Sequence, residues 1–206
     1  MKSSKITYAF LLFIVFTLLL CVSYILFKRY GIHTVIESRI YRSAQLSDIA
    51  LEQHINTKGI KTIINLRGKS ENDDRFLNEQ SLTQKYDIDL FNIRLDPNEL
   101  PDYRKLTDII GIISVSRKPL LIHCLRGVDR TGLVSAIAII IDSNVPFYKA
   151  KEQFSWKYGV LPFYRSVGPH FFSQYEDWLS SQKKIHDRET FLYWAKHIYI
   201  VSMGNM

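Results

Sequence analysis

The sequence predicts one α/β domain, with a central sheet of four or five strands and helices on both faces, preceded by an apolar N-terminal segment. Strand-like runs alternate with helix-like runs, without an internal repeat or a low-complexity linker. Leu120–His123 (LLIH) is a short apolar run of the kind found in strands buried on both faces. With 206 residues, 47% of them apolar, the chain is long enough for one core and too short for several domains.

Local signals predict each element of this domain. In chain order, the predicted elements are one or two short edge strands within residues 34–41, a helix between Ser47 and Gly59, a buried strand at 61–66, a helix at 72–86, a strand at 88–95, a turn-rich loop at 96–101, a helix at 102–116, the strand at 120–123 and a helix at 131–141. Ser47 caps the first helix and Gly59 ends it. Thr131–Ile141 is apolar nearly all round, which predicts a central helix.

The N-terminus holds an uncharged run from Ile6 to Phe27. As a helix this run would span about 33 Å, the thickness of a bilayer core. We therefore expect a single-pass membrane anchor at residues 1–30, followed by the folded domain at residues 31–206. A cleavable signal peptide is the weaker alternative, because no small-x-small site precedes Lys28.

The orientation of this anchor is left open by the positive-inside rule. Basic residues stand on both sides, namely Lys2 and Lys5 before it and Lys28, Arg29, Arg39 and Arg42 after it. The short N-terminal tail favours an extracytoplasmic position of the folded domain.

Composition excludes several classes of function. Only two cysteines occur, Cys21 and Cys124, which excludes a disulfide framework and a zinc site of four thiolates. The formal net charge is +7, but no Lys/Arg run is longer than a pair. The charge suits anionic substrates or an anionic membrane surface, and nucleic acid is not an expected partner.

The stretch His123–Gly132 (HCLRGVDRTG) places one thiol at the end of a buried strand and Arg130 at the start of a helix. The loop between them can turn its backbone N–H groups inward, which forms a site for a tetrahedral oxyanion. Gly127 permits such a curl. The N–H dipoles and the guanidinium also favour the thiolate form of Cys124, and Arg130 can bind two phosphate oxygens at once.

This stretch resembles the signature of the cysteine-dependent protein-tyrosine phosphatases, in the HCxxGxDRTG form of dual-specificity-like bacterial members. Upstream, YRSAQLS (Tyr41–Ser47) and KTIINLRG (Lys61–Gly68) look like the opening of those members. The resemblance implies the dual-specificity-phosphatase-like fold for residues 31–206. It also implies a cysteinyl-phosphate intermediate at Cys124, with no metal and no other cofactor.

The resemblance also implies roles for the neighbouring residues. Residues expected to bind phosphate are Leu125, Arg126, Gly127, Val128, Asp129 and Arg130; His123 and Thr131 are expected to support the site, the latter by a hydrogen bond to sulfur. Arg126 has the simpler interpretation of a solvated side chain, against the alternative of a contact to an extra phosphate. A catalytically inert Cys124 is disfavoured.

A general acid is expected on a loop upstream of the cysteine. Asp96 follows a predicted strand and is the first candidate. Asp102 is the second, with capping of the next helix as an equally good role. Asp129 is a third, and Asp89, within a strand, is the weakest.

Two features lie beyond the resemblance, which spans about residues 35–157. The apolar stripe of Phe191, Trp194, Ile198 and Val201 is predicted to cover the core, with a membrane-surface helix as the alternative. Arg165 could reach the rim of the pocket.

The predicted function is phosphate-ester hydrolysis on phosphotyrosine, and also on phosphoserine or phosphothreonine, in proteins at a membrane. One alternative is a lipid or inositol phosphate substrate. The other is a module that binds phosphorylated partners with little turnover.

Overall fold

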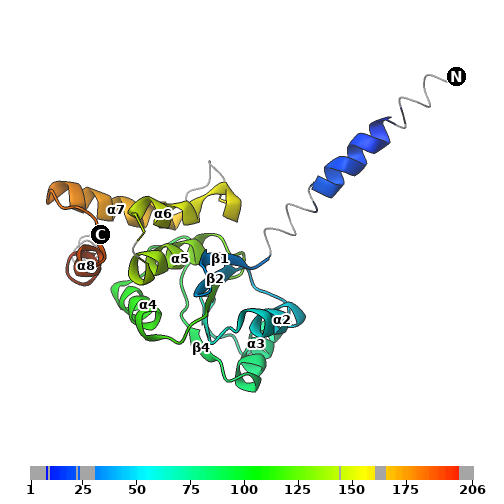
Figure 1. Ribbon diagram of the computed structural model, residues 1–206, viewed down its shortest axis with the longest axis horizontal. Helices are drawn as coiled ribbons and strands as arrows, with labels where there is room; N and C mark the ends of the chain where they lie inside the picture. The colour runs from blue at the N-terminus through cyan, green and yellow to red at the C-terminus, as the bar shows by residue number, and fades with distance from the viewer. Residues whose placement is uncertain are drawn as a thin grey trace.

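The computed structural model describes residues 8, 10–21, 23, 31–143, 145–160 and 166–199 (Figure 1). Its strands are β1 (His33–Ile36), β2 (Ile40–Ser43), β3 (Thr62–Asn65), β4 (Asp89–Asn92) and β5 (Leu120–His123). Its helices are α2 (Asp48–Lys58), α3 (Asp74–Lys85), α4 (Tyr103–Val115), α5 (Asp129–Asp142), α6 (Phe147–Lys151), α7 (Val167–Ser181) and α8 (Arg188–Tyr193), with the short turns η1 (Glu152–Phe154) and η2 (Trp156–Tyr158) and a π-helix η3 (Trp194–Ile198). The predicted α/β class is confirmed.

The five strands form one sheet in the order β1-β2-β5-β3-β4. β1 and β2 are antiparallel, and the other three pairings are parallel. β2 was expected at an edge, but it lies second in the sheet and pairs with β1 on one side and β5 on the other. The reason is that β1 and β2 form a hairpin whose outer strand occupies the edge, which buries every residue of β2.

Side chains alternate between the two faces of the sheet, as the twofold period of a strand requires. Ile64 and Ile122 lie in the larger cluster with α4, α5, α7 and α8. Ile63 and Leu121 lie in the smaller cluster with α2. Helices therefore cover both faces, with α2 and α3 on one side and α4 and α5 on the other (Figure 1).

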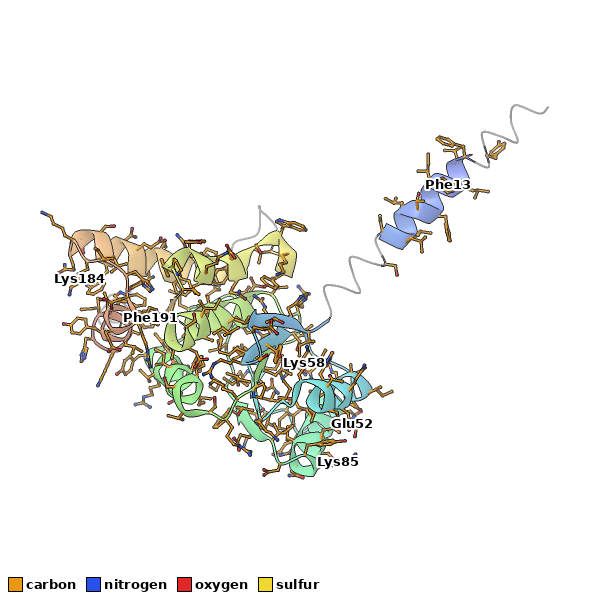
Figure 2. All side chains as sticks on the ribbon, in the orientation of Figure 1. Phe13, Glu52, Lys58, Lys85, Lys184 and Phe191 are labelled. Carbon is orange, nitrogen blue, oxygen red and sulfur yellow. The ribbon has the colours of Figure 1, made fainter. Side chains whose placement is uncertain are left out.

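Helix α5 is the central helix of the larger layer. All residues from Thr131 to Ile141 are buried, as their apolar character predicted. α6, α7 and α8 pack over its outer side (Figure 1). Phe191 and Trp194 are buried there, so the C-terminal stripe covers the core, while Val201 lies outside the described residues (Figure 2).

The ends of the first predicted helix follow their local signals. The Ser47 hydroxyl accepts a hydrogen bond from the backbone N–H of Ala50, and Gly59 ends α2 with a φ of +64°. On the same face of the sheet, Lys85 of α3 forms an ion pair of 2.7 Å with Glu52 of α2 (Figure 2).

At the N-terminus, residues 10–21 are helical and their apolar side chains are exposed, Leu12 at 70% and Phe13 at 64% (Figure 2). The predicted anchor from Ile6 to Phe27 extends beyond these residues at both ends. Within the part of the chain that the structure describes, no helix is long and apolar enough to cross a membrane.

Candidate active site

The segment that carries the predicted chemistry connects β5 to α5 at the carboxyl ends of the parallel strands. His123 ends β5, and its neighbours across the sheet are Ser43 of β2 and Asn65 of β3. Cys124 follows directly and is buried, and α5 begins at Asp129. The connecting loop therefore wraps around a helix N-terminus, where unpaired N–H groups and the helix dipole favour an anion.

The curl of this loop depends on Gly127. Its φ of +67° lies in the left-handed region, and its N–H donates a hydrogen bond of 3.3 Å to Sγ of Cys124. A Cβ here would stand 2.6 Å from the backbone N of Ala44 and 2.7 Å from the carbonyl carbon of Ser43. Glycine is therefore required for conformation and for space, and the resulting curl directs its N–H to the sulfur.

Arg130 is fixed by two backbone carbonyls that follow strands of the sheet. Its Nη1 donates hydrogen bonds to the carbonyl oxygens of Leu66 (3.2 Å) and Leu95 (3.3 Å), which follow β3 and β4. A pocket of about 290 Å³ is lined by Pro97, Asn98, Cys124, Leu125, Arg126, Asp129 and Arg130. The structure thus brings the thiol and the guanidinium of the predicted signature to one pocket.

Asp96 lies on the loop that borders this pocket. Its Oδ1 accepts a hydrogen bond of 2.8 Å from the backbone N–H of Asn98. This turn directs the loop so that Pro97 and Asn98 line the pocket of Cys124, while Asp96 lines the adjoining cleft beside Arg130. Asp96 therefore faces the cleft that adjoins the pocket and does not line the pocket itself.

Asp102 has a structural role at the start of α4. Its Oδ1 accepts a hydrogen bond of 2.9 Å from the N–H of Lys105, and its Oδ2 lies 3.0 Å from Nζ of that lysine. The backbone hydrogen bond, followed by the lysine ammonium, lowers the pKa of Asp102. It lines neither the pocket nor the adjoining cleft, so the structure favours the capping interpretation.

Asp129 contributes to the pocket from the first turn of α5. Its Oδ1 is buried and makes no hydrogen bond with any residue that the structure describes. Asp89, the weakest candidate, forms an ion pair of 2.8 Å with Arg117 at the edge strand β4, away from the pocket.

A wide basic cleft adjoins the pocket and shares Pro97, Leu125 and Arg130 with it. It measures about 680 Å³ and is lined by Arg67, Lys69, Ser70, Arg94, Leu95, Asp96, Pro97, Glu99, Lys105, Leu125 and Arg130. Arg67 is paired with Asp73 and Lys105 with Asp102. Lys69 and Arg94 form no ion pair among the described residues, so they carry the positive charge that is available to a ligand.

Arg126 and Arg165 had been singled out as further cations. Arg126 is exposed and lines both the pocket of Cys124 and a groove with Gln45 and Asp74 on the other side of the loop. Arg165 lies outside the described residues.

His123 is anchored beneath the loop by a buried carboxylate. Its Nε2 lies 2.8 Å from Oε1 of Glu79 on α3, and both side chains are nearly inaccessible. The other oxygen of Glu79 accepts a hydrogen bond of 2.9 Å from Asn65, whose own oxygen accepts one from the N–H of Arg67. The network fixes the end of β5 against β3 and α3.

Arg42 is a third guanidinium at the loop, beside Arg126 and Arg130, and the sequence prediction did not include it. It lies in β2, is 0% exposed, and contacts the loop from below. Burial lowers its pKa to about 10, opposed by the charges of Tyr158, Cys124 and Asp129, so it stays protonated at neutral pH. The predicted edge strands end at Tyr41, one residue before Arg42, so the sequence prediction did not place this side chain in a strand.

Comparisons with known proteins agree with this geometry. The family model of the DSP-PTPase phosphatase fused to NAD+ kinase matches residues 29–154, more than half of the chain. Comparison with curated proteins finds no match.

Several solved structures share the fold. The core catalytic domain of the PP-IP phosphatase SIW14 from S. cerevisiae, in complex with citrate, is 19% identical with a TM-score of 0.56, over 74% of this chain and 92% of that one. A DUF442 protein from Shewanella putrefaciens CN-32 is 16% identical with a TM-score of 0.53, over 76% of this chain and 94% of that one. Tk-PTP in its active form is 13% identical with a TM-score of 0.53, over 71% and 97%.

Proposed function

The chain belongs to the family of DSP-PTPase phosphatases fused to NAD+ kinase, and on this premise we propose that it hydrolyses phosphomonoesters through a phosphocysteine at Cys124. The observation that carries the proposal is the position of the Cys124 sulfur. It accepts a hydrogen bond from the Gly127 N–H and shares a pocket with Arg130 at the N-terminus of α5. An oxyanion bound by Arg130 and the loop N–H groups would stand beside this sulfur, where it can be attacked.

In the first step the Cys124 thiolate attacks phosphorus. The S–P bond forms while the P–O bond to the leaving group breaks, and Asp96 donates its proton to the departing oxygen. The backbone N–H groups of residues 125–130 and the Arg130 guanidinium stabilise the equatorial oxygens.

In the second step a water molecule attacks phosphorus and the S–P bond breaks. Asp96, now a carboxylate, takes the proton from the water, and phosphate leaves with Cys124 again a thiolate. The Thr131 hydroxyl is buried and has no hydrogen-bond partner among the described residues, which leaves it available to the departing sulfur. His123, fixed by Glu79, holds the end of β5 in place throughout.

For the substrate, the basic cleft favours a molecule with more than one anionic group. A single phosphate occupies the pocket of Cys124, whereas Lys69 and Arg94 face a separate volume of about 680 Å³. Solvent-accessible cations of this kind stabilise additional phosphates by charge-assisted hydrogen bonds. We therefore propose an inositol phosphate or a lipid headgroup with several phosphates. The fold neighbour SIW14 is a PP-IP phosphatase, which is consistent with that class.

A second candidate substrate is phosphotyrosine in proteins, which the HCxxGxDRTG resemblance implies. Leu125 at the pocket is 41% exposed, and Pro97 lies beside it, so the mouth offers apolar surface to an aromatic ring. Phosphoserine and phosphothreonine belong to the same candidate.

The two substrate classes are separated by replacing Arg94 in the full chain. Arg94→Gln is expected to lower kcat/KM for inositol hexakisphosphate by about 10-fold, because one charge-assisted hydrogen bond is lost. For p-nitrophenyl phosphate, kcat/KM is expected to fall by less than 2-fold. Both rates are measured as phosphate release in EDTA, for the wild type and the variant. Arg188→Gln, an identical change on the exposed start of α8, serves as the control and keeps both rates.

If Arg94→Gln leaves inositol hexakisphosphate hydrolysis unchanged while a phosphotyrosyl peptide is turned over faster, the phosphotyrosine candidate replaces the first. If no substrate is hydrolysed by the wild-type chain, the remaining alternative is a module that only binds phosphorylated partners.

We also propose that residues 6–27 anchor the protein in a membrane, with the folded domain on the extracytoplasmic side. The uncharged run and the exposed apolar side chains of residues 10–21 support anchoring, and the short N-terminal tail supports the orientation. An alkaline-phosphatase fusion after residue 45 should be active in this orientation and inactive in the opposite one.

Anchoring has its own test. A chain carrying Phe13→Arg and Phe16→Arg is expected to move from the membrane pellet to the supernatant, because each central arginine opposes insertion by about 2.5 to 3.5 kcal/mol. Ile49→Arg, which alters an 82% exposed apolar side chain on α2, should leave the chain in the pellet. Recovery of the double variant in the pellet after alkaline washing would contradict the anchor.

A further inference from the structure

Arg42 is held against the underside of the catalytic loop by hydrogen bonds to two successive loop carbonyls. Its Nη2 donates to the carbonyl oxygen of Gly127 over 2.7 Å and to that of Val128 over 3.3 Å. The side chain is completely buried, so these bonds are shielded from water. A buried guanidinium that binds neutral carbonyls is uncommon, because ion pairs usually compensate such a charge.

Because of the geometry of the peptide bond, these contacts also set the direction of two backbone N–H groups of the loop. In a trans peptide the C=O of one residue and the N–H of the next point in opposite directions. Carbonyls of Gly127 and Val128 that point down to Arg42 therefore direct the N–H groups of Val128 and Asp129 upward, toward the space that a bound phosphate occupies. The arginine thus contacts the faces of the two peptides that the substrate does not reach.

The guanidinium itself is locked from the opposite side. Its Nη1 donates to both the backbone carbonyl and the side-chain oxygen of Gln153 in η1, each over 2.9 Å. The ring of Tyr158 in η2 lies 3.9 Å from the guanidinium carbon. The segment after α6 therefore fixes a side chain from β2, which in turn fixes the catalytic loop.

The charge of Arg42 is directed to the loop rather than cancelled. Among the residues that the structure describes, it forms no ion pair. Its positive charge therefore adds to that of Arg130, which follows the same loop in the first turn of α5.

We propose that Arg42 is a positioning residue of the phosphatase site, which orients the Val128 and Asp129 N–H groups toward phosphate and stabilises the Cys124 thiolate from below. This inference rests on the proposed function, since it assigns a role within that site. Gln153 and Tyr158 act one step further away, by holding Arg42.

The test measures the loop without turnover. Tungstate, a tetrahedral oxyanion, is titrated into the full chain by calorimetry, and alkylation of Cys124 by iodoacetamide is followed against pH. Arg42→Met is expected to weaken tungstate binding by about 10- to 100-fold, because N–H groups aimed at a charged ligand lose their alignment. The pH midpoint of Cys124 alkylation is expected to rise by about one pH unit.

Arg42→Lys separates orientation from charge. A lysine keeps a positive charge but lacks the planar fork that reaches the loop carbonyls and Gln153 together. It is expected to restore most of the alkylation midpoint while tungstate binding stays at least about 10-fold weaker. This variant decides the question if Arg42→Met does not fold.

Phe191→Leu provides a control for loss of stability alone. Phe191 is fully buried under α7, far from the loop, so its truncation lowers the melting temperature without touching Arg42. Tungstate affinity and the alkylation midpoint should then match those of the wild type. If the Arg42 variants and Phe191→Leu bind tungstate equally well, the inference is wrong. A wild-type chain that binds no tungstate would instead refute the proposed function.

Discussion

Cys124→Ser is expected to abolish hydrolysis of p-nitrophenyl phosphate in EDTA, with a fall in kcat of at least about 10⁴-fold. Serine fits the pocket, but its hydroxyl is not ionised at neutral pH and is a far weaker nucleophile than a thiolate. The Gly127 N–H and Arg130 remain, so the variant should still bind tungstate. Initial rates and calorimetry on the same preparation measure both quantities.

Cys21→Ser is the matched control, because it makes the same chemical change at an exposed cysteine. Its kcat should equal that of the wild type. Phosphatase activity that survives in Cys124→Ser would place the nucleophile elsewhere and would contradict the account.

Asp96→Asn is expected to slow hydrolysis of substrates with poor leaving groups by about 10² to 10⁴-fold. A strongly basic alkoxide or phenolate needs a proton as the P–O bond breaks, whereas an acidic phenol such as p-nitrophenol leaves without one. The effect on phosphotyrosine or an inositol phosphate should therefore exceed the effect on p-nitrophenyl phosphate in the first step. A series of aryl phosphates, plotted as log kcat/KM against leaving-group pKa, shows this as a steeper slope in the variant.

Asp102→Asn is the control for this experiment. Asparagine caps a helix about as well as aspartate, so this variant keeps the cap of α4 and should keep the wild-type slope. Asp129→Asn is measured beside it, because the Asp129 carboxylate lines the pocket. If either variant shows the steep slope while Asp96→Asn behaves as wild type, the assignment of the acid is wrong.

The strand, loop and helix around Cys124 could be predicted because each is encoded locally. The apolar run before His123 and the apolar residues after Arg130 define the buried strand and helix, and Gly127 marks the curl. Because the carboxyl ends of parallel strands lie at one edge of a sheet, these segments alone place the loop at that edge.

Features that depend on strand order could not be read from the sequence. Arg42 is buried beneath the loop only because β1 takes the edge and β2 pairs with β5. The partner of His123 is Glu79 on α3. In the sequence, nothing distinguishes Glu79 from the other charged residues of that helix.

The basic cleft is likewise a product of tertiary structure. Lys69 follows β3, Arg94 follows β4 and Lys105 lies in α4; helix α3 and strand β4 separate the first two, and a loop separates the last two. No local pattern brings them together, so the second anionic group of the substrate could be proposed only from the fold.

The central claim is that phosphate is transferred to Cys124. The most direct measurement is acid quenching of Asp96→Asn during turnover of p-nitrophenyl phosphate, followed by mass spectrometry of the digested chain. The first step needs no acid with this leaving group, and the second lacks its base, so the intermediate should accumulate. The account predicts a burst of p-nitrophenolate and one phosphate on the peptide that contains Cys124. Phosphate on any other residue, or a burst in Cys124→Ser, would contradict it.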